Sequence, residues 1–577
     1  MNRTLRVAWF AAFTSTRRAQ YLLAGAAFLF GFSRPAQADS CRVAKPHAPT
    51  PAQDAYLHGD FPKAETLYRQ TLTDNPSDAA TVVGLVQSLL RQQKVSDAAA
   101  AIKSALTTEP KSAVLLTALA EVQYRQGLVV ESGESATAAY NADICYARVH
   151  LIRARLSRLN SMYATERKEI TSAHALDPGD PDIQSAWVET LPLTQRINEL
   201  KKYLNEPEGL DEKQHQDLER YLDRLEKISA EPQHRCRLVS GVNSTKLPLE
   251  SILGEQLRTR SWALMAKLNN ADAKLELDSG SSGFYISSKI AARAGLSSQE
   301  RNEVYGLGDH GPQGGYFAYA ASIRVGNLEF RDCPVDVSDR KYVGNVDGLV
   351  GTDIFEDFLV SIDFPRHSLE LSPLPVRPGE AAPAASLRTE MQAPTPQTDD
   401  GIEANPNGES QPIDSKGISP AAKQATTGPK DRYIAPEMQS WFPVFRSGHD
   451  LIVFGLIDKN ASKLFIIDTG SEATILSEDA ATEIRRIYES PERKVFGLNG
   501  EVEHVYSGGV FTIRFADKNM STREAAVMDL SRISYGAGVE ISGLIGLPAL
   551  KLMTIHIDYR DGLVKFDYDP TVVPDYK

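Results

Sequence analysis

The chain has 577 residues, which is too long for a single hydrophobic core and therefore predicts several domains. Hydrophobic residues make up 42% of the sequence and charged residues 24%, as in soluble globular proteins, so most of the chain is expected to fold. The formal net charge is -12 and the sequence has no basic cluster, which argues against nucleic acid as a partner.

Residues 1–38 differ in composition from the rest of the chain. They contain five arginines and no acidic residue, and they include an apolar run (Tyr21–Phe32) and the small-residue sequence AQA that ends at Ala38. This order is typical of a secretory signal peptide, so we expect cleavage after Ala38 and a periplasmic or secreted protein. The alternative is a retained membrane anchor. The apolar run is short for a bilayer span, and no membrane association is expected after cleavage.

Four cysteines follow the predicted cleavage site: Cys41, Cys145, Cys236 and Cys333. An even number of cysteines in an exported chain favours disulfides, and four cysteines permit three pairings. We favour Cys41 with Cys145 and Cys236 with Cys333, because each pair then stays near one domain. No CxxC motif or Cys/His cluster suggests a metal site, so neither a metal nor another cofactor is expected.

Residues from about 45 to 180 are rich in Ala and Leu and have helical periodicity, and further helical segments extend the predicted repeat domain to 45–232. Its prolines Pro76, Pro110 and Pro178 are spaced by 34 residues and by twice 34. Four units share a pattern of small and apolar positions around this spacing. The recurring positions are Gly59, Phe61, Ala64, Tyr68 and Pro76; then Val95, Ala98, Ile102, Ala105 and Pro110; then Gly127, Val129, Ala136 and Ala139; and then Tyr163, Ile170, Ala173 and Pro178.

This period, with small residues where helices touch, resembles the tetratricopeptide repeat. Ala allows paired helices to approach closely, and Pro ends the second helix of a unit before the next begins. Glu166 departs from the pattern by replacing the small residue of the fourth unit. The resemblance implies a helical solenoid that binds a protein partner or a substrate and carries no chemistry. A generic helical bundle is the alternative.

After Cys236 the sequence changes to short alternating strands and glycine turns, which predicts an all-β fold. The segment 376–432 is rich in Pro, Ala, Ser and Thr, which predicts a disordered linker. The linker separates two β-rich domains, 236–375 and 433–573. The predicted architecture is therefore an all-α solenoid followed by two all-β domains.

Two stretches in these domains share one pattern: LELDSGSSGFYIS (Leu275–Ser287) and LFIIDTGSEATILS (Leu464–Ser477). In each, an apolar strand ends in Asp, then Ser or Thr, then Gly, a tripeptide that by itself is typical of an ordinary turn. Further landmarks follow in the same order in both domains, which indicates an internal duplication. They are VYGLG and VFGLN, Gly314-Gly315 and Gly508-Gly509, DGLVG (Asp347–Gly351) and SGLIG (Ser542–Gly546), and IDF (362–364) and IDY (557–559).

This combination of motifs resembles the retropepsin-like domains of bacterial aspartyl protease family proteins. The resemblance covers both β-rich domains and implies an aspartic endopeptidase whose catalytic pair is Asp278 and Asp468. It also implies that the motifs Val350-Gly351 and Ile545-Gly546 pack beneath the active-site loops. The implied support residues are Ser279 and Thr469, through hydroxyl hydrogen bonds across a pseudo-twofold axis, and Gly280 and Gly470, through close backbone approach. The implied flap residues are Gly306, Gly308, Gly497 and Asn499.

The chemistry explains why two carboxylates are needed. Hydrolysis of a peptide bond without a metal or covalent intermediate requires a water to be deprotonated and the amide to be protonated in one site. Two adjacent carboxyl groups share one proton, so the pair acts as base and acid together. The two domains are expected to pair as an intramolecular pseudo-dimer. The expected partner is a protein or peptide substrate held between them.

Three other interpretations compete with this one. Both domains could be catalytically inactive and serve as a scaffold or peptide-binding protein, or like domains could pair between two chains. GLGDHG (Gly306–Gly311) matches the G-x-G-x-x-G pattern of dinucleotide sites, but Pro312 and two glycines follow it where that fold requires a helix.

Overall fold

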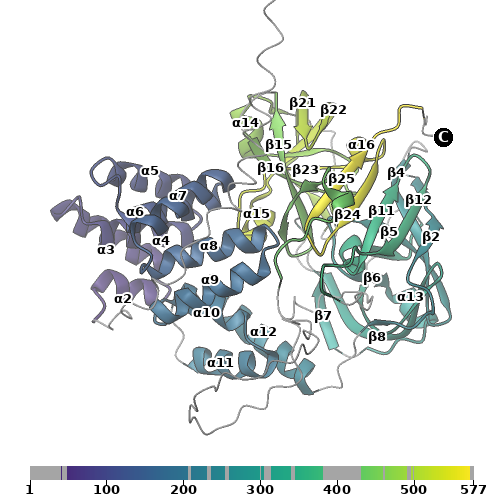
Figure 1. Ribbon diagram of the computed structural model, residues 1–577, viewed down its shortest axis with the longest axis horizontal. Coiled ribbons are helices and arrows are strands. Elements are labelled where there is room, and N and C mark those ends of the chain that lie inside the picture. Colours follow the sequence, from purple (N-terminus) through teal and green to yellow (C-terminus); the bar gives the residue numbers. More distant parts are fainter. Residues whose placement is uncertain are drawn as a thin grey trace, which may run out of the picture.

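Figure 1 shows the computed structural model, with a helical part beside a β-rich part. The predicted signal peptide and most of the predicted linker lie outside the described residues. The structure describes Cys41, Asp309 and the ranges 48–205, 209–230, 236–253, 259–298, 300–304, 313–338, 345–380, 430–458, 462–489, 495–497 and 500–571.

The N-terminal part is an array of helix pairs with the predicted period. Helices α3, α5, α7 and α9 begin at residues 61, 95, 129 and 163, and helices α4, α6, α8 and α10 begin at 79, 113, 147 and 181, always 34 residues apart. The helices are α2 (Pro51–Leu57), α3 (Phe61–Asp74), α4 (Ala79–Arg91), α5 (Val95–Leu106), α6 (Ala113–Arg125), α7 (Val129–Ala142), α8 (Ala147–Leu159), α9 (Tyr163–Leu176), α10 (Pro181–Glu189), α11 (Leu193–Asn205) and α12 (Glu212–Ala230).

Small side chains allow the helices of each pair to touch. Ala64, Ala98 and Ser132 occupy equivalent positions and are fully buried. Glu166, the exception noted in the sequence, is buried as well, and its carboxylate forms an ion pair with Arg158 at 3.1 Å. The fourth unit therefore has a buried carboxylate where the other units have a small side chain, and the ion pair with Arg158 offsets part of the cost of burying its charge.

The first β-rich domain, called lobe 1, contains one large sheet with the order β1-β9-β6-β10-β5-β4-β8-β7, and β3 pairs with β4. Its elements are β1 (Arg237–Leu238), β2 (Thr245–Pro248), β3 (Glu250–Leu253), β4 (Thr259–Leu268), β5 (Ala271–Asp278), β6 (Phe284–Ser287), α13 (Ser288–Arg293), β7 (Glu300–Val304), β8 (Gln313–Val325), β9 (Leu328–Ser338), β10 (Gly348–Gly351), β11 (Phe358–Asp363) and β12 (Ser368–Pro373).

The second β-rich domain, lobe 2, repeats this topology with the order β14-β15-β16-β23-β17-β22-β21-β18. Its elements are β13 (Phe442–Pro443), β14 (Phe445–Ser447), β15 (Asp450–Ile457), β16 (Ser462–Ile467), β17 (Ile475–Ser477), α14 (Glu478–Glu483), β18 (Tyr488–Glu489), β19 (Val495–Gly497), β20 (Gly500–Val502), β21 (Tyr506–Phe515), β22 (Lys518–Met528), α15 (Ser531–Ala537), β23 (Gly543–Ile545), α16 (Leu547–Leu550), β24 (Thr554–Asp558) and β25 (Leu563–Asp567).

Corresponding strands make the same pairings in both lobes. β5 runs antiparallel to β4 and parallel to β10, as β16 runs antiparallel to β15 and parallel to β23. A third sheet, β13-β25-β24-β11-β12-β2, joins the lobes through the antiparallel pair β11 and β24. The duplicated strands thus build one continuous unit, and its core draws buried residues from both lobes.

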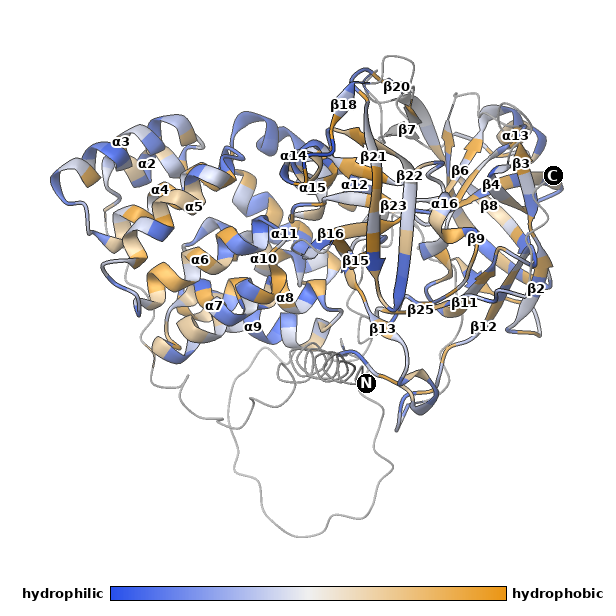
Figure 2. Cartoon of the chain, turned by 90° about the horizontal axis from the view of Figure 1, so that it is seen from above, coloured by the Kyte–Doolittle hydropathy of each residue, from blue (hydrophilic) through white to orange (hydrophobic). Residues whose placement is uncertain are grey.

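The array is packed against lobe 2. Apolar residues of α6, α7 and α8 form one buried cluster with residues of β15, β16, β17 and β23, and Figure 2 shows apolar segments on both sides of this contact. The Glu540 backbone N–H donates to the Arg125 carbonyl at 2.9 Å. Gly127 has a φ of +71° and lies against Glu540, where a Cβ atom would approach the carbonyl oxygen to 2.8 Å. The array is therefore packed against lobe 2 through a shared hydrophobic core and is not joined to it by the chain connection only.

The segment that follows the array folds back onto its first repeat. The Gly209 N–H donates to the Leu57 carbonyl at 2.6 Å, and Arg91 donates to the Gly209 carbonyl at 2.7 Å. Part of the array surface is therefore covered by the chain itself.

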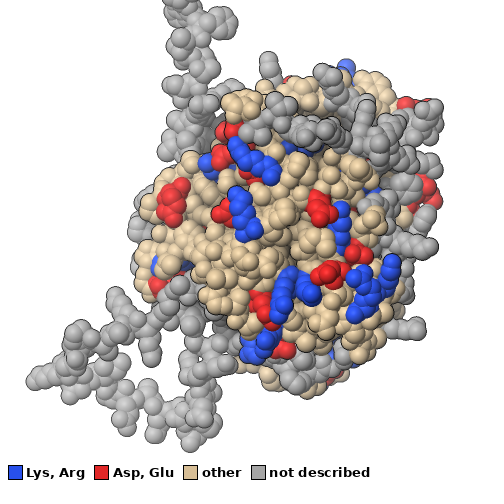
Figure 3. Space-filling model, turned by 90° about the vertical axis from the view of Figure 1, so that its right-hand side faces the viewer, with Lys and Arg blue, Asp and Glu red and all other residues tan. Residues whose placement is uncertain are grey.

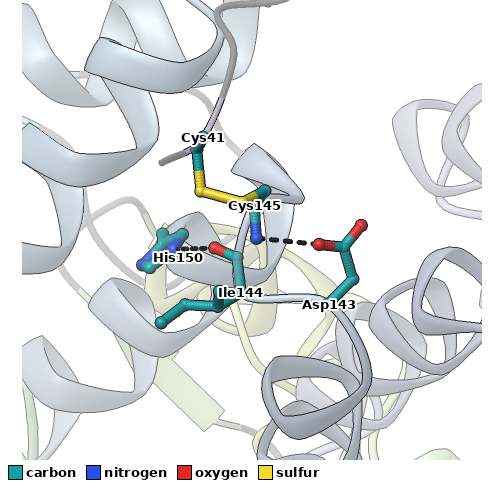
Figure 4. The surroundings of a disulfide bond; sticks show 5 residues. All are labelled: Cys41, Asp143, Ile144, Cys145 and His150. Carbon is teal, nitrogen blue, oxygen red and sulfur yellow. Dashed lines mark hydrogen bonds between the residues drawn. A yellow bond between two sulfur atoms is a disulfide. The ribbon is translucent and has the colours of Figure 1, made fainter. Parts of the chain in front are cut away.

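Both predicted disulfides are confirmed. Cys41 is bonded to Cys145 at the start of α8, where the Cys145 N–H donates to the Asp143 carboxylate and His150 donates to the Ile144 carbonyl (Figure 4). Cys236 is bonded to Cys333 within lobe 1. Each bond closes its own domain, as expected.

The described residues at the two ends of the predicted linker, 376–380 and 430–432, are attached to lobe 2. Arg377 forms an ion pair with the buried Asp561, Arg432 donates to the Asp561 carbonyl at 2.8 Å, and the Tyr433 N–H donates to the Asp561 carboxylate at 2.8 Å. Composition could not predict this, because the attachment point lies far along the sequence in lobe 2.

Figure 3 views the side of lobe 1 that carries β2, β12 and α13, where acidic and basic side chains are interspersed. Ion pairs such as Lys246 with Glu370 and Arg324 with Glu329 belong to this lobe. Within the described residues, no helix is both long and apolar enough to cross a membrane.

Candidate active site

Asp278 and Asp468 meet where the two lobes face each other. Asp278 is the last residue of β5, and Asp468 directly follows β16. Their side chains are hydrogen-bonded to each other, and both remain partly exposed. The structure thus places the two predicted aspartates in one site within one chain.

Gly280 and Gly470 provide the space for this contact. A Cβ atom on Gly280 would lie 2.7 Å from the Asp468 carboxyl carbon, and one on Gly470 would lie 2.4 Å from that of Asp278. Each glycine also donates its backbone N–H to the aspartate of its own lobe, at 2.8 Å for Gly280 and 3.0 Å for Gly470. A side chain at either position would push the carboxyl groups apart.

The hydroxyls of Ser279 and Thr469 cross the lobe boundary. The Ser279 N–H donates to the Thr469 hydroxyl at 2.9 Å, and the Thr469 N–H donates to the Ser279 hydroxyl at 3.0 Å. Each hydroxyl in turn donates to a carbonyl of the opposite lobe, Ser279 to Ile467 at 2.8 Å and Thr469 to Leu277 at 3.0 Å. Both side chains are buried, so four hydrogen bonds hold the aspartate loops together away from water.

The two hydrophobic-Gly motifs support these loops from below, as the resemblance implied. Gly351 lies opposite Asp278 in the parallel pair of β10 and β5, and the Asp468 N–H donates to the Ile545 carbonyl at 3.0 Å. Val350 and Ile545 are fully buried.

The electrostatics of the aspartate pair favour a shared proton. Burial raises the pKa of Asp278 well above its usual value, and the Asp468 charge raises it further. Burial also raises the pKa of Asp468, to about 6, although the hydrogen bond from Asp278 and the N–H groups of Gly470 and Ser471 oppose this rise. One carboxyl group therefore stays protonated at a pH where an ordinary aspartate is ionised.

The described flap segments of the two lobes touch. The Asp309 N–H donates to the Glu501 carbonyl at 3.1 Å, and the Glu503 N–H donates to the Asp309 carboxylate at 2.9 Å. Gly497 lies in β19, opposite Gly500 of β20. The other predicted flap residues, Gly306, Gly308 and Asn499, lie outside the described residues.

Sequence reasoning missed several charged residues near the aspartates. Arg260 of lobe 1 forms an ion pair with Glu472 of lobe 2, and His449 lies 3.4 Å from Asp450. Glu276 lies two residues before Asp278 on β5. A comparison of LELD with FIID could have identified Glu276, because the second domain has Ile466 at that position.

The described residues contain no group of three or more His, Cys, Asp or Glu side chains that could hold a metal ion. The arrangement can take a proton from a water through one carboxylate and give a proton through the other carboxyl group.

We predict that Thr469→Val destabilises the protein by about 1–3 kcal/mol and lowers activity, because the buried Ser279 N–H loses its acceptor while side-chain shape is kept. Thr469→Ser is the matched control and should stay close to wild type, since it retains the hydroxyl. Chemical denaturation measures the difference. Equal stability of the Val variant and the wild type would contradict a structural role for the crossed hydrogen bonds.

A second prediction concerns pH. An aspartate whose pKa is higher in the folded than in the unfolded protein favours folding only while it is protonated, so stability falls as pH rises from about 4 through about 6. Asp278→Asn removes one charge of the pair and should stabilise the protein at pH 8 by on the order of 3 kcal/mol, with the gain vanishing near pH 4.

Thermal melts between pH 4 and pH 8 measure this effect. The control is Asp272→Asn, which changes an exposed aspartate on the same strand and should follow the wild-type curve. Other buried acids, such as Asp558, are present in all three proteins, so their contributions cancel. A pH-independent effect of Asp278→Asn would contradict the shared proton.

Family models match both β-rich domains and the helical array. Two segments, 264–354 and 456–549, match the family model "Aspartyl protease", and each contains one aspartate of the pair. Two overlapping segments, 52–113 and 83–144, match the model "Tetratricopeptide repeat".

No match was found among curated proteins. One solved structure that matches is the crystal structure of aspartic proteinase from Irpex lacteus, at 10% identity and a TM-score of 0.34, covering 58% of this chain and 100% of that one. The family models, together with the repeated strands, show that this chain carries two aspartyl protease family domains behind an N-terminal array of tetratricopeptide repeats.

Proposed function

We propose that the protein is an aspartic endopeptidase that hydrolyses peptide bonds with a water activated by Asp278 and Asp468. The observation that carries this proposal is the direct hydrogen bond between two partly exposed carboxyl groups contributed by two copies of the same fold. An inactive scaffold has no need for glycines that admit opposing carboxylates or for buried hydroxyls that align them.

The mechanism follows from the geometry. The ionised carboxylate accepts a proton from the water as the water attacks the peptide carbonyl carbon, and the protonated carboxyl donates to the carbonyl oxygen. The resulting tetrahedral intermediate collapses when the leaving nitrogen is protonated and the C–N bond breaks. The flaps close over an extended substrate, and backbone groups at a flap can pair with it as an added strand.

We predict that Asp278→Asn and Asp468→Asn each lower kcat by at least about 100-fold, because either change removes one member of the acid–base pair. Cleavage of a denatured protein, read by mass spectrometry, is the measurement, and Asp272→Asn is the control. The wild type should also bind a peptide inhibitor that mimics the tetrahedral intermediate. A wild type that neither cleaves protein nor binds such an inhibitor supports the scaffold alternative.

We further propose that the protein is exported and that the array recruits a substrate or partner. The two disulfides support export, since such bonds persist in oxidising compartments. For the array, lobe 2 covers part of α6 to α8 and Gly209 covers part of α2 and α4, so a partner would use the remaining faces.

Export predicts a mature protein that begins at Asp39 and has no free thiol. N-terminal sequencing of protein from cell fractions, together with alkylation under denaturing, non-reducing conditions, tests both points. Full-length protein with reactive thiols in the cytoplasmic fraction would rule export out.

A further inference from the structure

Both lobes present a row of four side chains next to their aspartate, and the two rows differ in chemistry. Residues directly opposite one another in a sheet share a face, and residues two apart on a strand share a face as well. In lobe 1 the row crosses β4, β5, β10 and β6, and in lobe 2 it crosses β15, β16, β23 and β17. The rows are Ala263, Glu276, Leu349 and Tyr285 in lobe 1, and Ile452, Ile466, Leu544 and Ile475 in lobe 2.

Glu276 lies on the same face of β5 as Asp278, about 7 Å further back along the strand. Ile466 holds the equivalent place before Asp468. Because the duplication relates the lobes by a pseudo-twofold axis through the aspartate pair, the two positions flank the scissile bond on opposite sides. Glu276 is partly exposed on its side, whereas Ile466 is only 2% exposed on the other.

The cations near Glu276 are already paired. Arg260 forms an ion pair with Glu472 across the lobe boundary, and Lys274, on the same face of β5, forms one with Glu250 at 2.9 Å. Glu276 has no ion-pair partner among the described residues, yet it stays partly exposed toward the aspartates. Tyr285, at the end of the row, adds an aromatic ring.

The lobe 2 row is entirely aliphatic. Ile452, Ile466 and Leu544 are at most 4% exposed and belong to one apolar cluster with residues of α6, α7 and α8, against which the valines of β19 and β20 also pack. A charged substrate side chain on that side would lose its hydration without gaining a partner.

Resting on the proposed endopeptidase activity, we propose that Glu276 makes the cleft selective for a Lys or Arg side chain on the lobe 1 side of the scissile bond, with an apolar residue on the lobe 2 side. The carboxylate would form an ion pair with the substrate cation in a largely buried site, where charged hydrogen bonds are strong.

The protonation of Glu276 gives the selectivity a pH dependence. Burial raises the pKa of Glu276 to about 7; the Asp278 and Glu472 charges add to this rise, and the Ser261 hydroxyl and Arg260 oppose it. Because the carboxyl group is charged only above its pKa, the preference for Lys should strengthen as pH rises through about 7.

The first experiment digests a peptide library with the wild-type protein and reads both new termini. We expect Lys and Arg to be enriched on one side of the cut and apolar residues on the other. Two peptides that differ only by Lys or Met at the enriched position then give a ratio of kcat/KM values. Glu276→Gln should lower that ratio about 10- to 100-fold, mainly through KM, and should remove its pH dependence.

Two further variants make the test decisive. Glu276→Met should turn the preference toward apolar residues on both sides, a gain that misfolding cannot produce. Glu370→Gln changes an exposed lobe 1 acid on β12 that pairs with Lys246, and should leave the ratio unchanged. Cleavage without enrichment of basic residues, or an unchanged ratio in Glu276→Gln, overturns this inference and leaves the endopeptidase intact. Absence of any cleavage overturns both.

Discussion

Two carboxyl groups held in contact are the constraint on which this structure depends. Like charges repel at hydrogen-bond distance, so the contact persists only if one proton is shared and the loops on both sides are fixed. The crossed bonds of Ser279 and Thr469 fix the loops, and Gly280 and Gly470 leave room for the opposite carboxylate. Because every one of these groups reaches across the lobe boundary, neither lobe can form the site by itself.

The larger architecture serves the same contact. The six-stranded sheet joins β11 of lobe 1 to β24 of lobe 2, so the lobes share backbone hydrogen bonds as well as a core. Asp561 binds both ends of the intervening segment through Arg377 and the Tyr433 N–H. The connection between the lobes is therefore anchored close to the shared sheet, whatever its length.

The two halves have diverged where symmetry is not needed. The groups that align the aspartates are the same or chemically similar in both lobes, but the rows beside them differ. Glu276 and Tyr285 of lobe 1 occupy the positions that Ile466 and Ile475 occupy in lobe 2. The core that the array shares with lobe 2 adds to this asymmetry. A duplicated site can thus keep one proton-sharing centre and still offer two different surfaces to a substrate.

Much of the fold could be predicted because it has a local or periodic cause. The 34-residue period predicted where helices begin, and turn chemistry with repeated landmarks predicted two similar β domains and both aspartates. The cysteine pairs also followed from their place in the domain order. The roles of Arg260 and Asp309 could not be predicted, because their partners lie in the other lobe. The role of Asp561 could not be predicted either, because its partners lie at the two ends of the segment between the lobes, at sequence distances that no motif spans.

By itself, the sequence determined the repeat period, the duplication and the residue types of the candidate site, since each is encoded in short stretches by spacing and side-chain chemistry. Only the tertiary structure decided that the two aspartates meet within one chain, that the flap segments touch, and that the array shares a core with lobe 2. The physical reason is that these contacts depend on how separately folded surfaces complement each other, and that complementarity exists only after the chain has folded.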